Sequence, residues 1–404
     1  MNPTLRHEDD AADEREPTPA PGPRPSIGYW LYAGHLLGIV RMALSNILLG
    51  FTVLTFLLAA PWPATVWKRV APVALPLGLY VLLLLGSIVA SYDPAMSWPA
   101  ASEIFNLATL PLALILVRGE RAVRRLFDAF LIAAGLFAAW GLCQYFWGYG
   151  DIDSRIRGPF SHYMTFAGVL LIADALLLAT VACRQGWRSP WRWVGLALIN
   201  AALLGSLTRN AWVSLLLTLT VVLALRAPRL LLAYPPVAFV FVIFSPLPLL
   251  HRAVSIFDLQ DRSNYDRLCM IEAGLTMIAE RPVFGIGPNL VKVRYPIYRP
   301  PTAPRYEVPH LHNSLLQMAA ERGLPFAGAY LALIGLSFFV ALSRFRAEGG
   351  IAGPRADLHL GVMLALFAFS IAGLFENNWG DTEVQRVILF VLALPFCLAE
   401  PERP

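Results

Sequence analysis

Charged residues are scarce in this chain of 404 residues: only 15% are charged, while 57% are hydrophobic. A soluble globular protein carries about 25% charged residues, so this composition excludes that class. Apolar runs of about 20 residues recur, which is the length at which a helix crosses a bilayer. They lack the alternation of polar and apolar residues that barrel strands show. The sequence therefore predicts an all-α, polytopic membrane bundle.

Cysteine is also rare, and its spacing excludes the usual cysteine chemistry. Cys143, Cys183, Cys269 and Cys397 are scattered and form no CxxC pair, which disfavours zinc and redox sites. Cys143 and Cys269 could pair on the outer side of the membrane, with simple packing as the alternative. The net charge of +5 is modest and indicates membrane topology rather than binding to nucleic acid.

The basic clusters predict which loops lie in the cytoplasm. A stretch at 28–61 is too long for one span and is interrupted by Arg41 and by Ser45-Asn46, so we expect two short spans there. Ten further apolar runs lie at about 72–90, 101–117, 126–146, 162–182, 193–207, 210–225, 230–248, 324–343, 357–375 and 385–399. About twelve transmembrane helices follow, with both ends in the cytoplasm.

The same assignment predicts the domain organisation. Residues 1–25 are polar and Pro-rich, lack the order of a cleaved signal peptide, and are expected to form a disordered cytoplasmic tail. Spans one to nine fall within 26–250 and spans ten to twelve within 323–399, followed by a short tail at 400–404. Residues 251–322 form the one long segment on the outer side, and we expect short amphipathic helices in it.

This outer segment is rich in cations, and an anionic ligand would explain them. Arg209, in a short turn between two spans, could simply reach water or lipid phosphate, or could bind a phosphate with its guanidinium fork. Arg267 leads an amphipathic helix predicted from about 265 to 280, ending before Pro282. An ion pair with Glu272 and a ligand contact are equally open for Arg267.

The motif HLHN at 310–313 allows three interpretations. His310 and His312 would share a side only in extended backbone, and zinc needs three or four ligands, so a metal site is disfavoured. His312 or Asn313 could cap the helix that follows. The cap explains one of these two residues, which leaves His312 for acid–base chemistry near neutral pH.

Acidic residues at two places in the sequence are compatible with other functions. Asp151 and Asp153 could hold a divalent ion, although the arginines that follow favour a solvated loop. Asp174 lies in the middle of a predicted span, and a buried carboxylate there would suit a transporter.

Four motifs together resemble the O-antigen ligase and polymerase superfamily of bacterial envelope glycosyltransferases. RIRGPFSHYMTFAGVLL resembles its Arg-x-x-Gly-x-Phe entry to a span, and SLTRNAWVSLLL its Ser/Thr-Arg turn. RLCMIEAGLTMIAERPVFGIGPN resembles its Arg-led helix ending in Pro-x-x-Gly-x-Gly-Pro, and HLHNSLLQMAAERGLPFAG its His-Asn…Glu-x-Gly motif. The motifs extend from about Arg155 to Gly328. One departure is Ile271, where many members have tryptophan.

The resemblance implies a GT-C-like bundle in the bacterial inner membrane with its active site facing the periplasm. Such enzymes transfer a glycan from undecaprenyl diphosphate, and the ligase branch transfers it to lipid A–core. Arg209, Arg267 and Arg157 would bind the diphosphate, and His312 would act as the base of a metal-independent, cofactor-free inverting displacement. Supporting roles would fall to a further group: His310, Asn313, Arg155, Glu376 and Asp381.

Within that group, Glu376 and Asp381 are alternative candidates for the base. Gln317, Glu321 and Arg322 could serve only to orient the HLHN loop. Membrane lipids are expected partners and nucleic acid is not. The rival functions are an O-antigen polymerase or a protein-glycosylating ligase of the same superfamily and, from another class, a lipid-linked glycan flippase.

Overall fold

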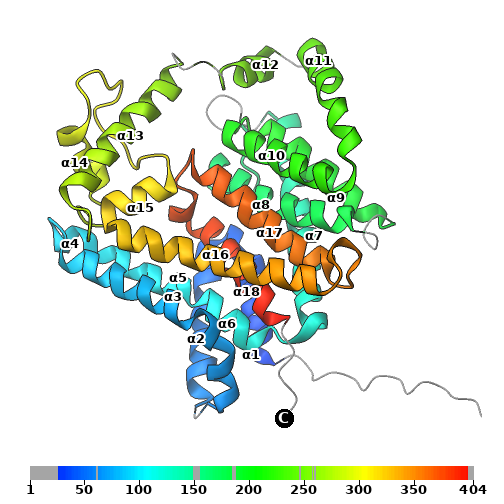
Figure 1. The fold of residues 1–404 in the computed structure, drawn as a ribbon, viewed down its shortest axis with the longest axis horizontal. Helices are drawn as coiled ribbons and strands as arrows, with labels where there is room; N and C mark the ends of the chain where they lie inside the picture. The colour runs from blue at the N-terminus through cyan, green and yellow to red at the C-terminus, as the bar shows by residue number, and fades with distance from the viewer. Residues whose placement is uncertain are drawn as a thin grey trace, which may run out of the picture.

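The computed structural model describes residues 26–60, 62–148, 155–183, 188–244, 247–256, 258 and 261–398. These residues form helices, turns and loops and no β-strand (Figure 1). The helices, with η marking 3₁₀ turns, are α1 (Ile27–Leu37), η1 (Gly38–Val40), α2 (Met42–Leu58), α3 (Ala64–Val89), α4 (Pro94–Ser97), η2 (Trp98–Ser102), α5 (Glu103–Leu107), α6 (Thr109–Leu116), α7 (Gly119–Phe146), α8 (Tyr163–Ala182), α9 (Pro190–Gly205), α10 (Arg209–Arg226), η4 (Pro228–Ala233), α11 (Tyr234–Phe244), α12 (Leu247–Val254), α13 (Arg262–Glu280), α14 (Val291–Tyr298), α15 (Ser314–Arg322), α16 (Leu324–Ala347), η5 (Gly350–Ala352), α17 (Ala356–Gly373), η6 (Asn378–Gly380) and α18 (Thr382–Cys397).

The molecule is a multi-pass membrane bundle, which confirms the predicted fold class. Seven helices among the described residues are long and apolar enough to cross a bilayer: Ala64–Val89, Pro94–Leu116, Gly119–Phe146, Tyr163–Ala182, Arg209–Arg226, Leu324–Ala347 and Ala356–Gly373. The other five predicted spans fall on helices of 11 to 17 residues, namely α1, α2, α9, α11 and α18. The count of twelve crossings therefore stays a prediction.

The long N-terminal apolar stretch divides where its polar residues predicted. α1 ends at Leu37, and Arg41 has an extended backbone that precedes α2. The two helices pack on each other. Ser45 is buried, and its hydroxyl donates to the carbonyl of His35 at 3.0 Å. A polar residue within each helix thus fixes how the two short helices meet.

α8 and α17 form the centre of the bundle (Figure 1). They are apolar on all sides, and 89% and 78% of their most hydrophobic windows are buried, against 28% for α3. A helix without a polar face is stable only where other helices surround it. The surrounding helices therefore fix the positions of the ends of α8 and α17. The loop after α17 starts from one of these fixed ends.

A second, smaller core lies beside the bundle. It joins α13, α14 and α15 through Met270, Met277, Tyr295 and Leu311, all at most 1% exposed. The turn after α13 packs directly on the end of α15, because Ile286 N–H donates to the Ala320 carbonyl at 2.9 Å. This unit occupies the predicted outer segment, and α13 matches the predicted helix at 265–280.

Two glycines allow that close packing. Gly285 has φ +66°, and a Cβ there would come within 2.3 Å of the Glu321 carbonyl carbon. Gly323 has φ +88°, and a Cβ there would come within 2.0 Å of the Val283 carbonyl oxygen. Any side chain at either position would push the turn away from α15.

Three sequence hypotheses concern cysteines and acidic residues. Cys143 and Cys269 are both free, so the pairing considered for them is wrong. Asp174 is buried on α8, where its carboxylate accepts a hydrogen bond from Asn200 of α9 at 2.7 Å. Asp151 and Asp153 lie outside the described residues.

Candidate functional site

The loop before α15 brings the side chains of two histidines together. Leu311 is 1% exposed and inserts into the core of α13–α15. His310 and His312, on either side of it, turn the other way, and their rings meet edge to face with centroids 4.3 Å apart. The sequence predicted that the two histidines would share a side only in extended backbone. That prediction is wrong, because the rings converge although His312 has a left-handed backbone with φ +49°.

Both histidines contact one carboxylate, that of Glu376 in the loop after α17. His312 Nδ1 lies 2.8 Å from Glu376 Oε2, and His310 Nε2 lies 3.3 Å from Oε1. Burial opposes ionisation of Glu376, but the hydrogen bond from His312 and the nearby histidines outweigh it and hold its pKa below the ordinary value. Burial also lowers the pKa of His310 to about 4. At neutral pH the group therefore combines an ionised carboxylate with a neutral His310.

The α15 N-terminus fixes the position of Glu376. Asn313 is the N-cap of α15, and its side chain accepts from Leu316 N–H at 2.9 Å while donating to the Leu374 carbonyl at 3.1 Å. The Ser314 hydroxyl donates to the backbone carbonyl of Glu376 at 3.1 Å. Asn313 is thus the predicted cap, and His312 is left for another role.

His312 itself has an unusual backbone conformation, with φ +49°. Only a few per cent of residues other than glycine adopt positive φ, and such strain is concentrated at functional sites. Leu207, two residues before Arg209, has φ +53°. The two turns that carry the predicted base and the first predicted phosphate ligand are therefore both strained.

Arg209 and Arg267 line one cavity of about 770 Å³, here called the arginine cavity. The other lining side chains are mostly apolar and come from α10, α11, α12 and the loop after α17: Trp212, Val213, Leu216, Leu217, Ala238, Val242, Leu250, Ala253, Val254, Ile256 and Phe375. An apolar cavity that contains two guanidinium groups is suited to bind a molecule with an apolar tail and an anionic head.

The two arginines differ in what holds them. Arg209 donates to the Ser255 hydroxyl at 2.8 Å and to the Ser263 hydroxyl at 3.1 Å, and lies 3.4 Å from the Asp261 carboxylate. The buried Nε of Arg267 has no hydrogen-bond partner within the described part of the chain. A buried donor without a partner is costly, so a ligand anion at this point would stabilise the site.

Arg267 also connects the arginine cavity to the histidines. Burial lowers the pKa of Arg267, the charge of Glu376 opposes that shift, and the charge of Arg209 adds to it. Three predicted site residues from α10, α13 and the HLHN loop are therefore neighbours in space, together with Glu376.

The remaining predicted residues make other contacts. Arg157 donates to the Ser161 carbonyl at 3.0 Å, and the Arg155 guanidinium lies over the Tyr163 ring at 4.5 Å. Neither lines the arginine cavity. Asp381 is the N-cap of α18 and also accepts from the Thr165 hydroxyl. The structure thus gives Asp381 a capping contact, and its role as an alternative base stays a prediction.

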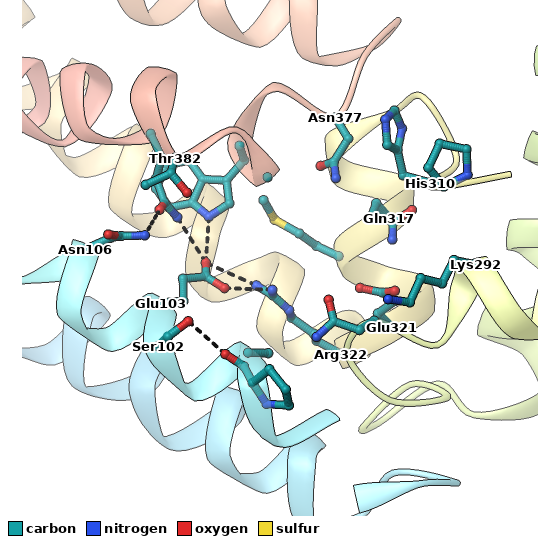
Figure 2. Close-up of a pocket in the computed structure, with 18 residues that line it drawn as sticks. Ser102, Glu103, Asn106, Lys292, His310, Gln317, Glu321, Arg322, Asn377 and Thr382 are labelled. Atoms are coloured by element: carbon teal, nitrogen blue, oxygen red, sulfur yellow. Dashed lines mark hydrogen bonds and ion pairs between the residues drawn. The ribbon is translucent and has the colours of Figure 1, made fainter. Parts of the chain in front are cut away.

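A second cavity, of about 360 Å³, is lined by His310 of the HLHN loop (Figure 2). Its wall contains an ion pair between Glu103 and Arg322, with Arg322 Nη2 2.7 Å from Glu103 Oε2. The same carboxylate accepts from Trp379 Nε1 at 3.0 Å and Gln385 Nε2 at 3.1 Å. Glu103 thus ties together α5, the end of α15, the loop after α17 and α18.

Glu103 was not among the predicted site residues, although an acidic residue at the start of an apolar run was visible in the sequence. Three of its partners, Arg322, Trp379 and Gln385, stand 219 to 282 positions later in the chain, which no local pattern reveals. Of the α15 residues expected to orient the HLHN loop, Gln317 contacts it, because its amide oxygen accepts from Leu311 N–H at 2.8 Å. Glu321 instead accepts from Val291 N–H of α14 at 3.2 Å.

His310, His312 and Glu376 together are a donor set that could hold a metal ion, since one ligand atom of each lies within 4.8 Å of the others. Two histidines and a glutamate are a known catalytic zinc set. The sequence did not reveal the third member, because Glu376 lies 64 residues after His312. Here His312 Nδ1 and Glu376 are already at direct hydrogen-bond distance.

Comparison with protein families gives one match, over residues 193–331, to the family described as O-antigen ligase. The matched segment contains Arg209, Arg267 and the HLHN loop, whereas Glu376 follows it. Comparison of the chain with curated proteins gives no match. The match at 193–331 supports a relationship of this segment to the O-antigen ligase and polymerase superfamily, whose members are glycosyltransferase-like enzymes.

Proposed function

We propose that this protein is an O-antigen ligase, which transfers a glycan from undecaprenyl diphosphate to a sugar hydroxyl of lipid A–core. The observation that carries this proposal is the hydrogen bond between His312 and Glu376, 2.8 Å long, beside a cavity that holds Arg209 and Arg267. A base and a cationic cradle for a leaving group are the two parts that such a transfer needs.

His312 is the base in this proposal. An ionised carboxylate can only accept hydrogen bonds, so Glu376 places the proton of His312 on Nδ1 and leaves a lone pair on Nε2. The acceptor hydroxyl attacks the anomeric carbon of the donor sugar and gives its proton to Nε2. The bond between that carbon and the phosphate oxygen breaks, and its electron pair leaves with the diphosphate. One displacement of this kind inverts the configuration.

The arginines stabilise the leaving group. Negative charge grows on the diphosphate as the bond breaks, and a guanidinium fork binds phosphate oxygens with two parallel hydrogen bonds. Arg267 brings a donor with no partner among the described residues, and Arg209 brings a guanidinium already oriented by two hydroxyls. The apolar lining of the cavity would receive the first part of the polyprenyl tail. Arg157 remains a secondary candidate for the diphosphate.

The proposed function also predicts which parts of the chain face each side of the membrane. The donor glycan and lipid A–core meet on the periplasmic side of the inner membrane, so residues 251–322 and the cavities would face the periplasm. The termini, including 1–25 and 400–404, would lie in the cytoplasm. The basic clusters between the spans support this orientation.

Chelation tests the metal-independent form of the proposal. We expect transfer by the purified protein to be unchanged after treatment with EDTA, because the arginines supply the positive charge and Glu376 already contacts His312. Activity that is lost with EDTA and restored by one divalent ion would instead assign the two histidines and Glu376 as metal ligands.

Deletion of the gene in its natural host tests the function as a whole, with lipopolysaccharide separated on a gel. We expect bare core, with full-length glycan remaining on undecaprenyl diphosphate, and rescue by the natural sequence. Core that carries a single repeat unit would make the protein a polymerase. An unchanged ladder would remove the lipopolysaccharide assignment and direct the search to glycoproteins. A flippase would leave the glycan unavailable on the outer leaflet, which a periplasmic glycosidase would detect.

A further inference from the structure

The second cavity, here called the amide cavity, has the composition of a saccharide site. Five of its lining side chains are carboxamides: Asn106, Asn289, Gln317, Asn377 and Gln385. Its formal charges balance, since Glu103 and Glu321 are matched by Lys292 and Arg322. Amides both donate and accept hydrogen bonds, as sugar hydroxyls do, and a neutral site does not require a charged ligand. Its volume of about 360 Å³ lies within the usual range for small-ligand pockets.

The loop after α17 leads from one cavity to the other in three consecutive residues. Phe375 lines the arginine cavity, Glu376 binds the histidines, and Asn377 lines the amide cavity. Figure 2 shows Asn377 and His310 side by side at one end of the amide cavity. Glu376, which contacts both histidines, therefore stands in the chain between a residue of the arginine cavity and a residue of the amide cavity, and His310 itself lines the amide cavity.

The chemistry of displacement requires such an arrangement. The attacking hydroxyl approaches the anomeric carbon from the side opposite to the leaving diphosphate. If the diphosphate lies between Arg209 and Arg267, the acceptor must come from the side of the histidines, and the amide cavity has His310 in its lining.

Asn377 is the residue best placed to meet an incoming sugar. Its backbone N–H donates to Glu376 Oε1 at 3.1 Å, while no hydrogen bond within the described part of the chain uses its carboxamide. Several other polar groups of the cavity are already engaged, as in the pair between Asn106 Nδ2 and Gln385 Oε1 at 3.1 Å. The Glu103–Arg322 pair gives the cavity a rigid wall (Figure 2).

We propose that the amide cavity binds the terminal sugar of the acceptor, an uncharged saccharide, with the Asn377 carboxamide as a direct hydrogen-bonding partner. This inference rests on the proposed function, because it takes the arginine cavity as the donor site. It adds a substrate-binding residue and an acceptor subsite, and it makes Glu103 a positioning residue that holds the wall.

Steady-state kinetics of the full-length protein in nanodiscs tests this subsite. The donor is undecaprenyl-diphosphate-linked glycan, and the acceptor is lipid A–core purified from the host that lacks the gene. We expect Asn377→Ala to raise the KM for acceptor about tenfold, as for the loss of a hydrogen bond or two, with the KM for donor unchanged. Equal KM values for acceptor in Asn377→Ala and the natural chain would overturn the role of Asn377.

A second variant, which blocks the amide cavity, keeps the subsite testable if Asn377→Ala fails to fold. Ser102 lines the cavity and is exposed, so Ser102→Trp should fold and obstruct the acceptor while sparing the donor. Thr276→Trp, exposed on α13 outside both cavities, is the control for added bulk. Full activity of Ser102→Trp with an unchanged KM for acceptor would overturn the subsite and leave the proposed function intact. Failure of the natural chain to transfer glycan to this acceptor would instead overturn the proposed function.

Discussion

Replacement of His312 by alanine is expected to lower the kcat of glycan transfer by about 10²–10⁴-fold, the usual contribution of a positioned general base. The physical reason is the loss of the Nε2 lone pair that receives the acceptor proton. The KM for donor should change little, because the arginine cavity does not include His312. The measurement is transfer by purified protein at saturating donor and acceptor, with thermal unfolding followed in parallel.

His251→Ala is the matched control, because His251 is exposed on α12 and lines neither cavity. Glu376→Gln should also reduce kcat, since an amide no longer fixes the proton of His312 on Nδ1, and the loss should be smaller than for His312→Ala. A His312→Ala variant that rescues the deletion strain fully would discard the base and leave HLHN as a loop before a helix cap.

Replacement of Arg267 by glutamine is the second large effect, with an expected loss in kcat of about 10²–10³-fold, as for removal of an oxyanion-stabilising donor. Arg267 has a buried Nε without a partner among the described residues, so its guanidinium is available for the diphosphate. Arg267→Lys should retain more activity, because the charge remains while the two-pronged geometry is lost. Rates of transfer with saturating donor measure both variants.

Arg262→Gln provides the control on the same helix, since Arg262 is the first residue of α13 and is exposed. Its activity should equal that of the natural chain. Equal losses for Arg262→Gln and Arg267→Gln would point to a general effect of positive charge on this face. In that case the specific contact with diphosphate would be rejected.

Much of the fold could be predicted because each membrane helix is a local pattern. The apolar runs, their lengths and the polar break near Arg41 can be recognised from residues that are close together in the sequence. Helix α13 and its end before Pro282 follow from spacing in the same way. The central position of α8 and α17 could not be predicted, because nearly every span is apolar and only packing decides which is surrounded.

In the candidate site, too, some residues could be predicted from local sequence and others could not. Arg209, Arg267 and His312 each stand in a motif whose residue types indicate a role. Glu376 was only one of two alternative bases, and the structure makes it the residue that orients His312 at 2.8 Å. Asn377 and Glu103 stand in no motif. Only the residues that surround them in the folded chain suggest a role for them.

The sequence by itself determined that this protein is a helical membrane bundle and that cations gather in one long segment, and it predicted a base at His312 beside a helix cap. These depend on hydrophobicity, charge and spacing, which are properties of neighbouring residues. Only the tertiary structure decided that Glu376 joins the histidines, that Arg157 does not line the arginine cavity, and that carboxamides from distant segments line a cavity beside His310. Those contacts join α5, α13, α15 and α18 across hundreds of positions, and their geometry is set by helix packing.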